Sequence, residues 1–156
     1  MAGRTRYVWI WFYGLLLGLA HLCAAQSEAA AELIEKGHWK RARVIVEARL
    51  RETPDDAAAH FYRSQIRNAF GDLSSPLPEA ERAVALEGDV ARFHRQIAEV
   101  LGVMAQHSNA FQQLFLARRF RKEIDTALSL DSHDTQALRD LMEFYLLAPG
   151  LAGGDR

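Results

Sequence analysis

The chain has 156 residues, of which 49% are hydrophobic and 25% are charged, and its formal net charge is −1. A chain of this length can form one domain that buries about two-thirds of the surface of its unfolded state. This composition is that of an ordinary globular protein. It argues against a disordered chain, and the near-neutral charge argues against a basic nucleic-acid-binding protein.

Residues 1–25 are typical of a secretory signal peptide. Two arginines precede an almost wholly apolar run at residues 7–22, and Cys23-Ala24-Ala25 then offers the small side chains that a signal peptidase requires. We therefore expect cleavage after Ala25 and a mature protein that is periplasmic or secreted. Two alternatives stay open: a lipoprotein signal at Cys23, and retention of the apolar run as a membrane anchor. We expect contact with a membrane only if this run is retained.

Removal of this leader would change the charge and the redox chemistry of the chain. The formal charge changes from −1 to −3, because two arginines and no acidic residue are lost. Cys23, the only cysteine, is lost as well, so the mature protein can form neither a disulfide nor a cysteine-ligated metal site. The stability of the fold must then come from helix packing.

Apolar residues at intervals of three and four predict helices along the rest of the chain. The first two lie between Ser27, a predicted N-cap, and Glu52, with a break at Gly37-His38. Thr53-Pro54-Asp55-Asp56 ends the second helix and caps the third, because proline disfavours helix in the residue before it and aspartate accepts from free backbone N–H groups. The later helices are predicted at residues 57–70, 74–86, 90–105, 109–130 and 135–147.

The last two predicted helices are unusual. The helix at 109–130 contains no residue that breaks a helix, and the helix at 135–147 has no returning partner before the linker or truncated end at 148–156. Such an end indicates either a fragment of a longer chain or an uncovered surface that binds a partner or a second copy of the chain. The side chains predicted to be buried on the long helix are Phe111, Leu114, Phe115, Phe120, Ile124, Ala127 and Leu128. Those predicted to pack backward from the last helix are Leu138, Leu141, Met142 and Tyr145.

The helices recur in pairs with a period of 34 residues. Gly37 is matched by Gly71 and His60 by His94, and a third copy follows 44 residues further on, after an insertion of about ten residues. A period of this length with helical content is typical of a helix-hairpin solenoid. The fold is therefore predicted more firmly than the ligand, which depends on the side chains of one face.

Three segments resemble tetratricopeptide repeats: Gly37-x-Trp39-x-x-Ala42 ending at Pro54, Ala83-Val84-x-Leu86, and Ala127-Leu128-x-Leu130-Asp131. The resemblance covers nearly all of the predicted domain at 26–147. It implies an all-α, right-handed superhelical solenoid of antiparallel helix hairpins, with about three repeats and an unpaired final helix. The later repeats are degenerate, since Pro76 stands where Ala42 stood and Gly88 replaces Pro54. The long helix and the residues after it are also similar to exported bacterial repeat proteins of undefined activity.

In tetratricopeptide arrays the first helix of each pair lines a concave groove in which peptides usually lie. The resemblance therefore implies a peptide-binding groove on these helices of the chain. Asn68, Arg95 and Arg139 could together hold a peptide carboxylate, since guanidinium groups pair with carboxylates in a bidentate fork. The alternative is a solvated helix face. The implied groove residues are Phe61, Gln65, Asn68, Arg92, Arg95, Glu99, Arg139 and Glu143.

Two further groups of side chains have simple structural explanations. His60 and His94 occupy equivalent repeat positions, but a zinc site needs three or four ligands and no zinc-binding spacing is present, so we predict that both pack between helices. The basic cluster at 118–122 is predicted to be a solvated outer face rather than a lipid or nucleic-acid site, because acidic residues follow it.

The sequence contains no grouping of residues that indicates catalysis. It has no glycine-rich phosphate loop after a strand and no serine in a nucleophile elbow. We therefore expect an exported, non-enzymatic scaffold that binds a protein or peptide segment, without a cofactor, a metal or nucleic acid. The alternative is the helical accessory part of a larger exported enzyme or envelope assembly factor.

Overall fold

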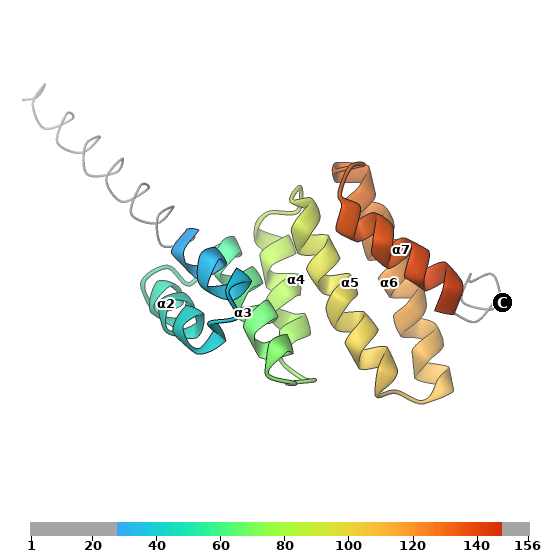
Figure 1. Ribbon diagram of the computed structural model, residues 1–156, viewed down its shortest axis with the longest axis horizontal. Coiled ribbons are helices and arrows are strands. Elements are labelled where there is room, and N and C mark those ends of the chain that lie inside the picture. The colour runs from blue at the N-terminus through green and yellow to red at the C-terminus, as the bar shows by residue number, and fades with distance from the viewer. Residues whose placement is uncertain (1–27, 148–156) are drawn as a thin grey trace, which may run out of the picture. The chain divides into compact units, whose positions relative to one another are not determined.

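The computed structural model describes residues 28–147, and every regular element within this range is an α-helix (Figure 1). The all-helical class predicted from the sequence is therefore confirmed. The predicted signal peptide, the predicted cap at Ser27 and the segment at 148–156 lie outside the described residues. The chain divides into two compact units, residues 1–45 and 46–156.

In the first unit, residues 28–35 form a helix that ends shortly before α2 (Trp39–Glu52), which continues into the second unit. Gly37 has a φ of +72°, a left-handed conformation that glycine adopts without the steric cost of a side chain. In the second unit, Gly71 has a φ of +75° at the matching place after α3. Both glycines therefore follow the end of a helix, as the sequence pattern predicts.

In the second unit, the last residues of α2 are followed by a series of helices up to Leu147. Successive helices lie side by side and run in alternate directions (Figure 1). Their bounds agree with the predicted ranges to within two residues, and α6 has the expected 21 residues without a break. The helices are α3 (Ala57–Ala69), α4 (Pro76–Leu86), α5 (Ala91–Gln106), α6 (Ala110–Leu130) and α7 (Thr135–Leu147).

Two side-chain oxygens cap the starts of α3 and α6. Asp56 Oδ1 accepts from the backbone N–H of Ala59 at 2.8 Å, and Asn109 Oδ1 accepts from that of Gln112 at 3.0 Å. Asp56 also accepts from Arg49 Nε at 3.0 Å, and both side chains of this ion pair are only 7% exposed. The predicted cap at Asp56 is confirmed, and it also joins the end of α2 to the start of α3.

A third aspartate organises the loop before α4. Asp72 Oδ1 accepts from the backbone N–H groups of Ser74 and Ser75 at 2.9 and 3.2 Å. Hydrogen bonds from these two serines hold the pKa of Asp72 well below its usual range. Pro76 then begins α4, where the missing N–H of proline does not interrupt a helical hydrogen bond. The loop therefore starts the helix even though Ser75 makes no side-chain cap.

The core of the second unit combines large apolar side chains with small residues. Phe93 is fully buried, and its ring centroid lies 5.2 Å from that of Phe61. Ile97 and Leu101 on α5 pack against Ala80 on α4. Side chains with no exposed surface allow the helix backbones to approach closely. Among them are Ser64, Ala80, Ala83, Ala98 and Ala127.

The predicted buried face of α6 is wrong in its first half. Phe111 and Phe115 are 71% and 54% exposed, and their rings contact each other at a centroid distance of 4.9 Å. Only Ile124 and Ala127 on α6 are fully buried. Helical spacing placed all of these side chains on one stripe, but the described residues include no helix that covers the outer part of that stripe.

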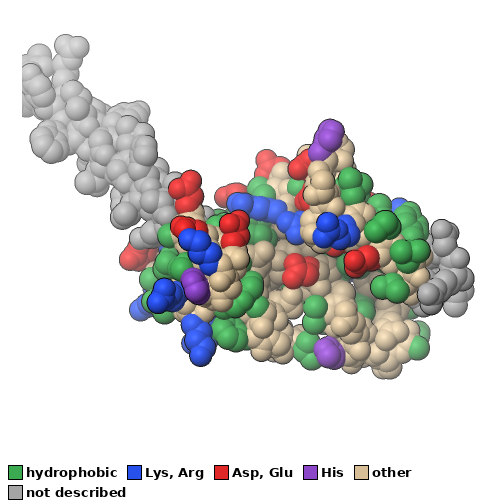
Figure 2. Space-filling model, in the orientation of Figure 1, with side chains coloured by type: hydrophobic (Ala, Val, Ile, Leu, Met, Phe, Trp, Pro, Cys, Tyr) green, Lys and Arg blue, Asp and Glu red, His purple; other side chains and the backbone are tan. Residues whose placement is uncertain are grey.

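The packing of α7 also differs from the prediction. Leu138 and Met142 were expected to pack backward, yet they are 47% and 56% exposed, whereas Ala137 and Phe144 are buried. The ring of Phe144 stacks on that of Phe120 at a centroid distance of 5.6 Å. The helix is therefore rotated relative to the expectation. Figure 2 shows hydrophobic side chains gathered on the face of α7 that points away from the rest of this unit.

Candidate functional site

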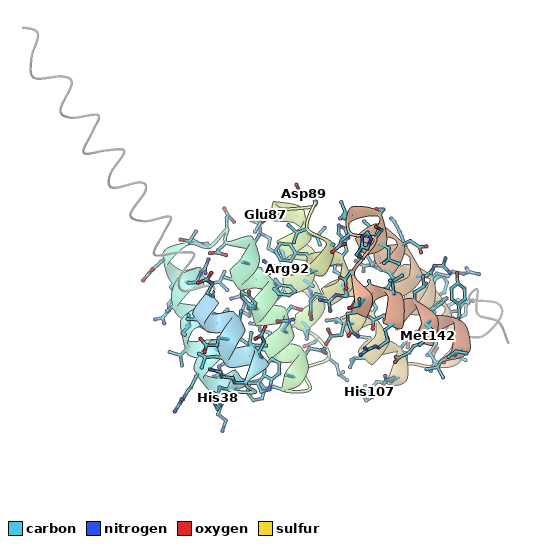
Figure 3. The ribbon with its side chains drawn as sticks, turned by 45° about the horizontal axis from the view of Figure 1, so that its top comes forward. His38, Glu87, Asp89, Arg92, His107 and Met142 are labelled. Atoms are coloured by element: carbon cyan, nitrogen blue, oxygen red, sulfur yellow. The ribbon has the colours of Figure 1, made fainter. Side chains whose placement is uncertain are left out.

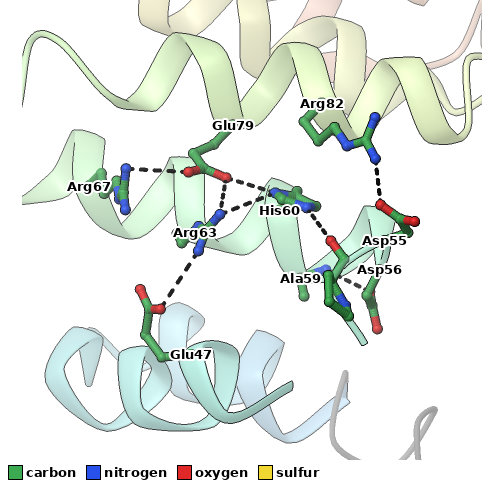
Figure 4. A network of polar contacts seen from close by, with 10 residues as sticks. Glu47, Asp55, Asp56, Ala59, His60, Arg63, Arg67, Glu79 and Arg82 are labelled. Carbon is green, nitrogen blue, oxygen red and sulfur yellow. Dashed lines mark hydrogen bonds and ion pairs between the residues drawn. The ribbon is translucent and has the colours of Figure 1, made fainter. Parts of the chain in front are cut away.

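His60 is held from two sides inside the second hairpin (Figure 4). Its Nδ1 lies 2.7 Å from Glu79 Oε2 on α4, and its Nε2 lies 2.8 Å from the carbonyl oxygen of Pro54. A carbonyl oxygen only accepts, so Nε2 donates to Pro54, and Nδ1 contacts the carboxylate of Glu79. Both ring nitrogens are thus used within the fold, which confirms the predicted structural role of His60.

His94 makes the same pair of contacts one repeat later. Its Nδ1 lies 2.8 Å from Glu123 Oε2, and its Nε2 lies 3.0 Å from the carbonyl oxygen of Gly88. His94 and Gly88 lie 34 residues after His60 and Pro54 in the sequence. Glu123 lies 44 residues after Glu79. The additional residues of the third hairpin therefore lie between His94 and Glu123, and they leave these contacts unchanged.

Glu79 is the centre of a small charge network between α3 and α4. Arg63 Nη2 lies 2.7 Å from its Oε2, and Arg67 Nη1 lies 3.3 Å from its Oε1. Burial acts to raise the pKa of Glu79, but the hydrogen bonds from His60 and Arg63 and the positive charges of Arg63 and Arg67 outweigh it, so the pKa is lowered. The ionised carboxylate therefore stabilises the hairpin.

The additional residues of the third hairpin form the first half of α6. This helix has 21 residues, whereas α4 has 11. Since Glu123 corresponds to Glu79, the C-terminal part of α6 matches α4 and the insertion falls at residues 110–119. The partner helix is longer as well, with 16 residues in α5 against 13 in α3. The third hairpin thus extends beyond the second at its turn.

A pocket of about 450 Å³ lies where this extended hairpin meets α7. Leu116 and Ala117, both from the insertion, line it together with Phe120 and Phe144. Gly102 on α5 also lines the pocket, and a Cβ atom placed there would lie 3.7 Å from the Phe120 ring. The walls are α5 and α7, which contact each other sparsely, and α6 lies between them. A volume of this size accommodates large apolar side chains.

Three carboxylates line the same pocket: Glu99 on α5, and Asp140 and Glu143 on α7. Partial removal from water raises the pKa of Glu99, and the charge of Asp140 adds to this effect, although a hydrogen bond from Asn68 and the charge of Arg95 oppose it. No lysine or arginine among residues 28–147 forms an ion pair with Asp140 or Glu143. The pocket therefore combines apolar surface with three acidic side chains and no basic side chain in its lining.

Solved structures of similar backbone place this arrangement among known folds. The first TPR of Spaghetti (RPAP3) bound to the HSP90 peptide SRMEEVD has a TM-score of 0.62 at 13% identity, over 78% of this chain and 88% of that chain. The Yersinia enterocolitica type III secretion chaperone SycD in complex with a peptide of the translocator YopD has a TM-score of 0.61 at 14% identity, over 81% and 94%. A further structure of SycD has a TM-score of 0.62 at 13% identity, over 80% and 82%. This chain has the tetratricopeptide-repeat fold.

The tetratricopeptide-repeat resemblance seen in the sequence is thus confirmed at the level of the fold. No family model and no curated protein matches the sequence. In this fold, α3, α5 and α7 are the first helices of successive hairpins, and they are the helices that carry the groove residues implied by the resemblance.

Two of these groove residues, Glu99 and Glu143, line the pocket. Asn68 Nδ2 donates to Glu99 Oε1 at 3.1 Å, and Arg95 Nε donates to Asp134 Oδ2 at 3.1 Å. These two donors, which were expected to hold a peptide carboxylate together with Arg139, thus already bind carboxylates of the chain itself. Arg139 is exposed on α7.

The remaining groove residues lie nearer the start of the second unit. Phe61 is 5% exposed, and the guanidinium carbon of Arg92 lies 5.4 Å from the centroids of the Phe61 and Phe93 rings. Arg92 itself is exposed beside the loop between α4 and α5 (Figure 3). Gln65 is half-buried on α3. Phe61 therefore contributes mainly to packing, whereas the side chain of Arg92 is accessible to solvent.

Sequence reasoning missed most of the pocket residues. Asp140 lies three residues before Glu143, so helical spacing from this predicted groove residue would have found it, and Phe144 lies four residues after Asp140. Leu116, Ala117 and Phe120 belong to the long helix that the sequence identified, but Phe120 was assigned to a buried stripe. No sequence signal shows that α5 and α7 stand apart over these residues.

Two arginines of the basic cluster on α6 pair with acidic side chains of the fold. Arg119 pairs with Glu81 and lies 4.0 Å from Glu123, whereas Arg121 Nε donates to Asp125 at 2.9 Å and its guanidinium lies 4.8 Å from the Tyr145 ring centroid. Within residues 28–147, no three histidine, cysteine or acidic side chains are grouped so as to hold a metal ion. None of the helices in this range has the length and apolar character needed to cross a membrane.

Proposed function

We propose that this protein is a non-enzymatic interaction scaffold that binds a peptide segment of a partner protein in the groove lined by α3, α5 and α7. The observation that carries the proposal is the pocket at α5, α6 and α7, which presents Leu116, Phe120 and Phe144 beside three carboxylates. Two proteins of similar fold were solved with peptides, the RPAP3 repeat with an HSP90 peptide and SycD with a YopD peptide. Both support a peptide as the ligand.

The proposed binding mechanism is passive. The helices that form the pocket pack on one another, since Leu101 on α5 and Phe144 on α7 are both buried and both pack against Phe120 on α6. A preformed site loses little conformational entropy when a segment docks, so more of the contact energy contributes to affinity. A large apolar side chain of the segment would enter the pocket. The implied groove residues on α3 and α5, such as Gln65 and Arg92, would contact the rest of the segment.

We further propose that the protein acts outside the cytoplasm, on the strength of the leader at residues 1–25. Its partner would then be an exported or envelope protein. N-terminal sequencing of the exported product tests this part separately. Gln26 as the first residue supports cleavage after Ala25, and a product that begins at Met1 supports the retained anchor instead.

A pocket-filling variant tests the binding proposal. Random peptides displayed on phage are selected on the purified protein, and the affinity of an enriched peptide is measured by fluorescence anisotropy. Ala117→Phe fills the pocket and should weaken binding by about tenfold or more. Ala85→Phe makes the same substitution at an exposed position of α4 and should leave the affinity unchanged. Equal affinities of the two variants, both folded by circular dichroism, would contradict the proposed site.

A further inference from the structure

The charges around the pocket restrict the chemistry of the segment that it can hold. Glu99, Asp140 and Glu143 are its only charged lining residues within the described part of the chain. Two predicted groove cations, Arg95 and Arg139, are not part of the lining, and Arg95, whose charge acts on Glu99, donates to Asp134 at 3.1 Å. An acidic segment would therefore approach three like charges that have no basic residue between them.

The three carboxylates lie above apolar surface on facing helices. Glu99 and Gly102 are one helical turn apart on α5, and Asp140 and Phe144 are one turn apart on α7. Each wall thus presents a carboxylate beside apolar or small residues. Partial removal from water and the charge of Asp140 raise the pKa of Glu99, and a cation placed beside the three carboxylates would oppose this effect. The three carboxylates of the lining, without a basic side chain among them, by themselves favour a positively charged group.

We propose that the pocket binds a partner segment in which a lysine or arginine lies next to a large apolar side chain. The apolar side chain contacts Leu116, Phe120 and Phe144, and the cation lies among the carboxylates of Glu99, Asp140 and Glu143. Opposite charges across an interface fix the register of the segment and reject acidic partners. This proposal rests on the proposed function, and it reverses the carboxylate ligand that Asn68, Arg95 and Arg139 suggested from the sequence.

The test uses the random-peptide selection on the whole purified protein and reads the composition of the enriched peptides. Enrichment of peptides with a basic residue adjacent to leucine, methionine or an aromatic residue supports the proposal. Enrichment of acidic or purely apolar peptides overturns it and leaves the scaffold function standing. If no peptide is enriched, both the pocket chemistry and the scaffold function are wrong.

Charge variants then locate the cation. The combined variant Glu99→Gln, Asp140→Asn and Glu143→Gln should bind the enriched basic peptide about tenfold more weakly than the wild type does. Raising the salt from about 50 mM to about 500 mM should also lower the affinity of the wild type for this peptide. The matched control is Glu52→Gln, Glu87→Gln and Asp89→Asn, which removes three exposed acids elsewhere. Figure 3 shows Glu87 and Asp89 in the loop between α4 and α5, away from Met142 on α7.

A substitution at one exposed position tests the proposal with a variant that should still fold. Glu143 is exposed, so Glu143→Lys should fold and should weaken the basic peptide by repulsion by about tenfold. An affinity that is unchanged in Glu143→Lys, or reduced equally by the control variant, overturns the proposal.

Discussion

His94 Nδ1 lies 2.8 Å from Glu123 Oε2, a contact that joins the first turn of α5 to the C-terminal half of α6. The corresponding pair in the preceding hairpin, His60 and Glu79, lies at 2.7 Å. In both hairpins the second ring nitrogen donates to the loop that precedes the histidine's own helix. A single buried imidazole therefore fixes a loop and two helices relative to one another.

Removal of this imidazole should destabilise the fold. His94→Ala leaves the carbonyl of Gly88 and the carboxylate of Glu123 without the imidazole that contacts both, so the free energy of unfolding should fall by about 2 kcal/mol. Urea unfolding followed by circular dichroism measures the change. His107→Ala alters an exposed histidine and should change the free energy of unfolding by less than about 0.5 kcal/mol. A small effect of both substitutions would contradict the structural role of His94.

The charge network at Glu79 predicts a loss of stability in acid. Its pKa in the folded state is lowered from the ordinary value of 4.5, so the unfolded chain binds the proton more readily than the folded one. The contribution of Glu79 is fully present above about pH 4.5 and is lost as the pH falls through the lower folded-state pKa. Urea unfolding of the wild type and Glu79→Gln at several pH values should give a difference in stability that shrinks below about pH 4.5. A difference that grows on acidification would overturn this assignment.

Two glycines should respond in opposite directions to alanine. Gly71 has a φ of +75°, which costs an alanine about 1 kcal/mol, so Gly71→Ala should lower the free energy of unfolding by that amount. Gly102 lies within α5, and the nearest atom to an added Cβ is 3.7 Å away, so Gly102→Ala should raise the free energy of unfolding by about 0.5 kcal/mol. Chemical unfolding of the two variants decides the point. Changes of the same sign would show that the local conformations are not as described.

The buried ion pair between Arg49 and Asp56 supports a fourth stability experiment. Asp56→Ala removes the cap of α3 and leaves the Arg49 guanidinium without this carboxylate, so the free energy of unfolding should fall by about 3 kcal/mol. Asp56→Asn retains an oxygen that can accept from the backbone N–H of Ala59. Its free energy of unfolding should therefore lie between those of the wild type and the alanine variant. If asparagine is as destabilising as alanine, the charge rather than the cap dominates.

The uncovered face of α7 predicts self-association. Leu138, Met142 and Leu146 are each about half exposed, at 47%, 56% and 59%, and they follow one another at intervals of four residues. We expect the wild type to associate with increasing concentration in sedimentation velocity experiments. Met142→Glu with Leu146→Glu should fold normally and stay monomeric, because the substituted side chains are already in contact with solvent. A wild type that is monomeric at every concentration would contradict this expectation.

The helices were predictable because their boundaries depend on local chemistry. Gly71 needs a positive φ, Asp56 and Asn109 cap the helices that follow them, and Pro76 starts a helix in its first turn. Each of these effects acts within a few residues along the chain. The sequence alone was therefore sufficient for the helix ranges and for their arrangement in hairpins.

The pocket and the exposed faces were not predictable in the same way. Phe111 and Phe115 have the spacing of buried side chains, but burial depends on whether another helix covers them, which is a property of the tertiary arrangement. The void between α5 and α7 depends on the separation of two helices about forty residues apart in the chain. Glu99 and Glu143 were found because they lie on the first helices of hairpins. Asp140 lies one helical turn before Glu143 and was missed because only Arg139 and Glu143 were assigned to the groove on this helix.

The matched contacts of His60 and His94 also show which end of a hairpin can change in length. The imidazole and the loop carbonyl both lie at the end where one hairpin joins the one before it, and the insertion at 110–119 was accommodated at the opposite end. Turns such as the one between Gln106 and Ala110 are thus extensible, and they can accept new segments without disturbing the stack. Foreign peptide sequences grafted at this turn should be tolerated, whereas grafts beside Gly88 should not.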